Sequence, residues 1–96
     1  MSETTNIAEQ AIQAQLRRLE WMIPDAQRRL AGVAQEMLRR AQNAVNDSEA
    51  MLTNQPCSMT WVEFAECDLR NAREAKADLT KLYEQQAMLK FLLKND

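Results

Sequence analysis

The chain has 96 residues, a formal net charge of −2, a single glycine and no histidine. This length allows one small domain with a thin core, and the near balance of charge excludes the usual basic type of nucleic-acid-binding protein. Histidine is the commonest general base and a common metal ligand, so we expect no enzyme, no metal site and no cofactor.

The composition favours helices throughout. Aromatic residues make up 5% of the chain, and β-branched residues are few, which leaves no candidate strand. We therefore predict an all-α fold with a single helical domain over residues 1–96. No apolar run approaches the roughly 20 residues that cross a bilayer, so we expect no membrane span.

The first predicted helix spans about residues 7–52, with Asn6 as its N-cap. Apolar residues recur along it at alternating steps of four and three, which is the spacing of a heptad stripe. The stripe contains Ile12, Leu16, Leu19, Ile23, Ala26, Leu30, Val33 and Met37. From there we expect it to drift through Ala41, Ala44 or Val45, Ser48 and Leu52.

Pro24 lies in the middle of this stripe. A proline inside a helix removes one backbone hydrogen bond and costs about 3 kcal/mol, whereas the first turn of a new helix tolerates it. The first helix is therefore either kinked at Pro24 or split into two. The stripe keeps the same phase on both sides of Pro24, which favours a kinked but continuous path.

A loop is predicted over residues 53–59 and a second helix over residues 60–94. Asn54 is expected to end the first helix in a left-handed conformation, and Pro56 prevents the helix from continuing. Thr60 and Glu63 form a capping box at the start of the second helix. The heptad stripe of this helix contains Trp61, Ala65, Asp68, Ala72, Ala75, Leu79, Leu82, Gln86, Leu89 and Leu93.

A short loop between two long helices makes them antiparallel neighbours. We therefore predict a long antiparallel helical hairpin, with Leu52 opposite Trp61. In that alignment three arginine doublets meet three acids. The expected pairs are Arg17 and Arg18 with Asp96, Arg28 and Arg29 with Glu84, and Arg39 and Arg40 with Glu74.

The arginine doublets recur every eleven residues and therefore stack on one side of a straight helix. They are either a flank of salt bridges to the second helix or a basic stripe that binds phosphates. We favour the salt bridges, because the acids fall where the hairpin requires them.

Several large apolar residues lie outside both heptad stripes, which indicates a further buried face. The residues predicted to bind a partner are Trp21, Met22, Phe91 and Leu92, together with Arg17, Arg18, Arg28 and Arg29. This face would bind either a different protein or a second copy of the chain. We favour the second copy, which gives a homodimer in which two hairpins form a four-helix bundle.

Asp68 and Gln86 interrupt the second stripe. Polar residues at such positions fix the register of a coiled coil or mark a seam that is locally wet. A catalytic role for Asp68 is disfavoured, because no second titratable group is placed beside it. Cys57 and Cys67 are interpreted as free thiols, and the N-terminus has no signal-peptide pattern, so we expect a cytoplasmic protein.

In architecture such a hairpin resembles dimeric four-helix regulators of the Rop type, helical chaperones of secretion systems, and accessory or inhibitor proteins of phages and plasmids. Heptads alone say little about function. We expect a non-enzymatic protein–protein interaction module that acts as an adaptor, regulator or inhibitor. The alternatives are a nucleic-acid-binding accessory protein that uses the arginine doublets, and a secretion-type helical chaperone.

Overall fold

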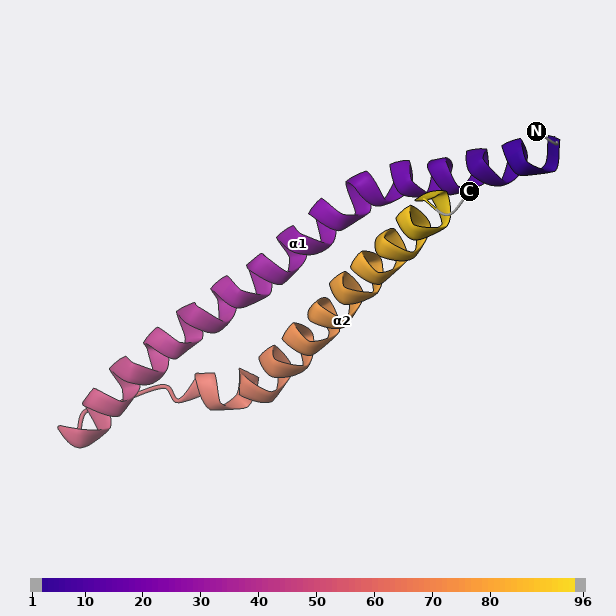
Figure 1. Ribbon diagram of the computed structural model, residues 1–96. Helices are drawn as coiled ribbons and strands as arrows, with labels where there is room; N and C mark the ends of the chain where they lie inside the picture. Colours follow the sequence, from indigo (N-terminus) through magenta and orange to yellow (C-terminus); the bar gives the residue numbers. More distant parts are fainter. Residues whose placement is uncertain (1–2, 95–96) are drawn as a thin grey trace. The chain divides into compact units, whose positions relative to one another are not determined.

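The computed structural model describes residues 3–94, which form two long helices joined by one loop. Helix α1 spans Glu3–Leu52 and helix α2 spans Thr60–Lys94 (Figure 1). No residue of the described range lies in a strand. The prediction of an all-α helical hairpin is confirmed.

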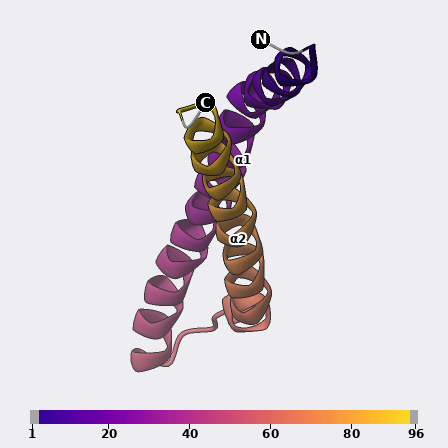
Figure 2. The same cartoon turned by 45° about the vertical axis from the view of Figure 1, so that its right-hand side comes forward.

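The chain divides into two compact units, each built from one segment of α1 and one segment of α2. Unit 1 contains residues 1–28 and 77–96, and unit 2 contains residues 29–76, including the loop. Within each unit the two helical segments lie side by side and run in opposite directions (Figures 1 and 2). In unit 1 the side-chain amide of Gln27 donates a hydrogen bond of 2.7 Å to the hydroxyl of Tyr83.

Helix α1 begins earlier than predicted and is not interrupted at Pro24. Asn6 lies inside the helix and is not its N-cap, because the residues from Glu3 onward are already helical. These first residues are modest helix formers, but none is Pro or Gly, so nothing in the backbone ends the helix there. Pro24 also lies inside α1, and the alternative of two separate helices is therefore wrong.

The pattern of burial confirms the predicted stripes over most of both helices. On α1, all eight predicted positions from Ile12 to Met37 are buried or half-buried. On α2, every predicted position except Ala65 is buried or half-buried. These residues form the seam between the two helical segments of each unit. The buried apolar residues within residues 7–94 are Leu19, Ile23 and Ala75.

Beyond Met37 the predicted drift of the first stripe is wrong except at Ala44, one of the two alternatives named for its position. The predicted residues that are exposed instead are Ala41, Val45, Ser48 and Leu52. The half-buried residues that continue the seam are Arg40, Ala44 and Asp47. They keep the alternating steps of four and three from Met37 without a shift. Two of these positions are charged, and both side chains have partners: Arg40 pairs with Asp68, and Asp47 accepts a hydrogen bond from the N–H of Met59.

The loop ends α1 with a left-handed residue, as predicted. Asn54 has a φ of 57°. The N–H of Gln55 donates to the carbonyl of Ala50 at 2.7 Å, and the N–H of Asn54 donates to the carbonyl of Met51 at 3.2 Å. This pair of hydrogen bonds is a Schellman motif, which satisfies two carbonyls at the end of the helix.

Asp47 determines where α2 starts relative to α1. Its Oδ2 accepts a hydrogen bond of 2.9 Å from the N–H of Met59, so the loop runs back along α1 before α2 begins. The predicted alignment of Leu52 with Trp61 is therefore wrong. Trp61 instead lines a groove together with Arg40, Ala41 and Ala44, which precede the end of α1 by about two to three helical turns.

Candidate functional site

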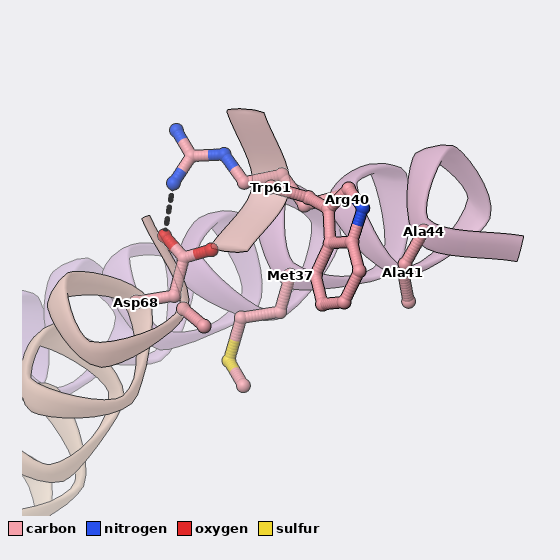
Figure 3. A pocket seen from close by; sticks show the side chains of 7 residues that line it. Met37, Arg40, Ala41, Ala44, Trp61 and Asp68 are labelled. Carbon is pink, nitrogen blue, oxygen red and sulfur yellow. Dashed lines mark hydrogen bonds and ion pairs between the residues drawn. The ribbon is translucent and has the colours of Figure 1, made fainter. Parts of the chain in front are cut away.

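Asp68 is buried in unit 2 and forms an ion pair with Arg40 across the seam (Figure 3). The guanidinium of Arg40 donates a hydrogen bond to the carboxylate of Asp68. The two side chains are only 24% and 11% exposed, so water screens this pair less than it screens a surface pair. The pair joins α1 and α2 at one level, as a polar pair that fixes register does.

Arg40 also contacts two further residues of unit 2. Its guanidinium carbon lies 4.5 Å from the centroid of the Phe64 ring, which is a cation–π geometry. Its Nη2 atom lies 3.5 Å from a carboxylate oxygen of Glu36. Arg40 is thus held by an acid and a ring of α2 and by an acid of its own helix.

Arg39, the neighbour of Arg40 in the sequence, lies on the surface. It donates a hydrogen bond of 2.8 Å to Glu36, and this bond, followed by the positive charge of Arg39, lowers the pKa of Glu36 below its ordinary value. One arginine of the doublet therefore belongs to the seam and the other to the exposed side of α1. The predicted pairing of both with Glu74 is wrong.

A groove of about 280 Å³ lies next to this ion pair, between α1 and α2 of unit 2. Its lining residues are Met37, Arg40, Ala41, Ala44, Trp61, Ala65 and Asp68 (Figure 3). The indole Nε1 of Trp61 is buried and has no hydrogen-bond partner among the described residues. Such an N–H costs about 1–3 kcal/mol, so Trp61 stabilises the seam through its apolar ring alone.

The chemistry available at this site is that of a structural contact. A guanidinium donates hydrogen bonds but does not release its proton near neutral pH, so Arg40 cannot exchange protons with Asp68. Within residues 7–94 no three His, Cys, Asp or Glu side chains gather in a way that would hold a metal ion. Cys57 and Cys67 are both free and half-buried.

The predicted partner-binding residues Trp21 and Phe91 are exposed in unit 1 but lie on opposite sides of it. Each lies two residues after a seam position, Leu19 or Leu89, and two residues before the next. On a helix this spacing places a side chain on the side farthest from the seam. The two aromatic side chains therefore point away from each other and do not form one anchor.

Met22 and Leu92, by contrast, lie on the same side of unit 1. Met22 is half-buried and Leu92 is exposed, and each directly precedes a seam position. In antiparallel helices such positions flank the seam on one side. Met88, four residues before Leu92, is also exposed and extends this apolar patch. The sequence analysis missed Met88, although its spacing from Leu92 is the signal that finds it.

The arginines predicted to orient a partner, Arg17, Arg18, Arg28 and Arg29, are exposed on α1. Arg28 forms an ion pair of 3.3 Å with Asp25 of its own helix, instead of the predicted pair with Glu84. Asp96, the acid predicted for the first doublet, lies outside the described residues.

The arginine doublets do not follow a single line along the seam. A heptad stripe makes one turn around the helix about every 3.5 residues. Side chains eleven residues apart therefore differ by about 50° in their position around the helix relative to that stripe. The side chain is exposed at Arg18 and Arg29 but half-buried at Arg40. The series therefore winds into the seam at Arg40.

A second apolar stripe runs along α1 in unit 2, about 100° around the helix from the seam, because each of its first four residues directly follows a seam position. It contains Ala31, Ala34, Leu38, Ala41, Val45, Ser48 and Leu52, at alternating steps of three and four, and all of these residues are exposed. We call it the outer stripe. The sequence analysis merged its last residues with the seam, because both series have heptad spacing.

No protein-family model, no curated protein and no solved structure matches the chain. Among the described residues, no helix is both long enough and apolar enough to cross a membrane. The surfaces described above are therefore the basis for a proposed function.

Proposed function

We propose that the protein is a non-enzymatic helical module for protein–protein interaction. The observation that supports this most strongly is the imbalance between buried and exposed apolar residues. Within residues 7–94, three apolar residues are buried, whereas fourteen large apolar side chains are exposed. A helical pair that functions alone would cover more of its apolar surface than this.

The accessible surface supports the same proposal. It amounts to 7662 Å² for a chain of 11.1 kDa, whereas a compact monomer of this mass has about 5,700 Å². The excess is about 2,000 Å², which is larger than the roughly 800 Å² that each partner buries in a standard protein–protein interface. The chain therefore has enough uncovered surface for at least one stable partner.

The proposed partner-binding surface lies in unit 1. Met22, Met88 and Leu92 form its apolar centre on one side of the seam, because flexible methionines and leucines adapt to a partner. Trp21 and Phe91 extend the contact to the outer sides of the two helices. The exposed arginines of α1 in this unit, Arg17, Arg18 and Arg28, orient the partner and raise the association rate.

Self-association belongs to the same proposal. Two hairpins pack into a four-helix bundle when each helix has apolar residues toward two neighbours, and α1 has two apolar stripes in unit 2. The two free thiols, Cys57 and Cys67, fit a reducing compartment such as the cytoplasm.

Affinity capture with quantitative mass spectrometry tests the partner-binding surface. The intact chain is compared with Met88→Gln/Leu92→Gln and with the control Val62→Gln/Leu69→Gln, which changes two exposed apolar residues of unit 2. A specific partner is retained by the intact chain and the control and reduced at least tenfold by the unit 1 variant. Equal retention by all three proteins would show that this patch binds nothing specifically.

A mobility-shift assay separates this proposal from nucleic-acid binding. An interaction module gives no shift with duplex DNA or RNA at low salt. A nucleic-acid-binding protein gives a shift that disappears as the salt concentration rises, because phosphate contacts release counterions. In that case Arg28→Gln/Arg29→Gln would lower the salt dependence of binding by about two units.

A further inference from the structure

Beyond Met37, helix α1 of unit 2 has small and charged residues toward α2, whereas larger apolar residues lie on the outer stripe. The residues toward α2 are Arg40, Ala44 and Asp47. The large residues of the outer stripe are Leu38, Val45 and Leu52, which are 61%, 56% and 85% exposed. A helix with one covered side normally places its large apolar residues on that side. The outer stripe therefore has the character of a covered surface.

Large and small residues alternate along the outer stripe. Leu38, Val45 and Leu52 occupy one kind of heptad position, and Ala34, Ala41 and Ser48 occupy the other. The hydroxyl of Ser48 donates a hydrogen bond of 2.8 Å to the carbonyl of Val45, so it brings no unpaired polar group to an interface. The stripe is thus suited to close packing against another helix.

We propose that the outer stripe packs against the same stripe of a second copy of the chain, with the two α1 helices antiparallel. This inference rests on the self-association proposed above and specifies its surface and direction. In an antiparallel pair the two kinds of heptad position face each other, so every layer combines a large residue with a small one. The layers are Leu52 with Ala34, Val45 with Ala41, and Leu38 with Ser48 of the second copy.

Packing and charge both favour a second copy in this orientation. In a parallel pair, large residues would face large residues and small residues would face small ones. Overpacked layers would then alternate with layers that contain cavities. In the antiparallel pair, Arg39 of one copy lies on the flank of the stripe near Glu49 of the second copy, and the two-fold symmetry repeats this contact. Gln35 and Gln42, the other flanking residues, are uncharged, so no like charges meet.

Sedimentation equilibrium over a range of concentrations tests the surface. The intact chain is expected at twice its mass of 11.1 kDa. Leu38→Gln/Val45→Gln should raise the dimer dissociation constant at least a hundredfold, while the control Ile7→Gln, at an exposed residue of unit 1, leaves it unchanged. An unchanged constant in Leu38→Gln/Val45→Gln would overturn the outer stripe as the interface but leave self-association intact. A monomeric intact chain would overturn both.

Disulfide cross-linking tests the direction of the pair and does not depend on a destabilised variant. In a Cys57→Ser/Cys67→Ser background, Gln42→Cys lies near the proposed two-fold axis and should form a covalent dimer in mild oxidant. The two copies of Glu49→Cys would be about 20 Å apart and should remain unlinked. Equal cross-linking of both variants would indicate a parallel pair, and no cross-linking of either would exclude pairing through this stripe; both results would overturn the proposal.

Discussion

Replacing Asp68 by alanine tests whether its ion pair with Arg40 fixes the alignment of the helices in unit 2. Two unit charges about 4 Å apart attract each other by about 4 kcal/mol at an effective dielectric constant of about 20, and desolvation offsets part of this. A surface pair contributes at most about 1 kcal/mol, whereas breaking a buried pair costs about 3–5 kcal/mol. The pair is half-buried, and Arg40 keeps Glu36 as a second partner. We therefore expect Asp68→Ala to lower the free energy of unfolding by about 2 kcal/mol.

Urea denaturation followed by circular dichroism at one fixed protein concentration measures this loss. A double-mutant cycle with Arg40→Ala should give a coupling free energy of about 1–2 kcal/mol. Arg40→Ala alone should cost more than Asp68→Ala, because the contact with Phe64 contributes about 0.5–1 kcal/mol.

The Asp25–Arg28 pair is a matched control for this cycle. Its side chains are 69% and 74% exposed, so the same cycle with Asp25→Ala and Arg28→Ala should give a coupling below about 0.5 kcal/mol. If the Arg40–Asp68 cycle were additive to within about 0.3 kcal/mol, the pair would behave as a surface contact. The claim that it fixes the register would then be wrong.

Three further predictions concern single side chains. A Cβ at Gly32 meets no atom within 4 Å, so Gly32→Ala should stabilise the helix by about 0.5–1 kcal/mol in the same assay; a loss would indicate a hidden contact. Trp61→Phe should lower the free energy of unfolding by less than about 1 kcal/mol, because the indole N–H has no partner. Trp61→Ala should lower it by about 3 kcal/mol. Equal losses in the two variants would contradict this prediction. Arg39→Gln should raise the pKa of Glu36, measured by NMR titration, toward its ordinary value. Because this pKa is lowered in the folded chain, the contribution of the pair is present at neutral pH and is lost as the pH falls through it; an unchanged pKa would exclude Arg39 as the cause.

The sequence predicts the two helices, their apolar stripes and the left-handed residue Asn54, because these features depend on local spacing and backbone preference. The alignment of the helices was not predictable in the same way. It depends on the hydrogen bond between Asp47 and the N–H of Met59, which forms only after the loop runs back along α1. The predicted alignment, which places Leu52 opposite Trp61, takes no account of that contact.

The same limit applies to the candidate site. Asp68 was recognised as a polar residue in a seam, but Arg40 was paired with Glu74 together with Arg39, because the pairs were derived from the alignment of Leu52 with Trp61. Trp21 and Phe91 were grouped by their size, although their spacing from the seam places them on opposite sides of unit 1. In both cases the position of the residue within the heptad repeat indicates on which side of the helix its side chain lies.

Two heptad stripes of α1 in unit 2 compete for α2, and charged contacts decide between them. Beyond Met37 the outer stripe has the larger apolar residues, so on apolar area alone a rotation of this part of α1 by about 100° would bury more surface. That rotation would separate Arg40 from Asp68 and Asp47 from the Met59 N–H, leaving buried groups unpaired. Replacing both Arg40 and Asp68 by leucine removes this constraint and adds apolar area. We expect the double variant to remain helical but to give doubled or broadened amide resonances, because either stripe then packs against α2. A single sharp set of resonances would mean that Asp47 and the loop suffice to fix the rotation.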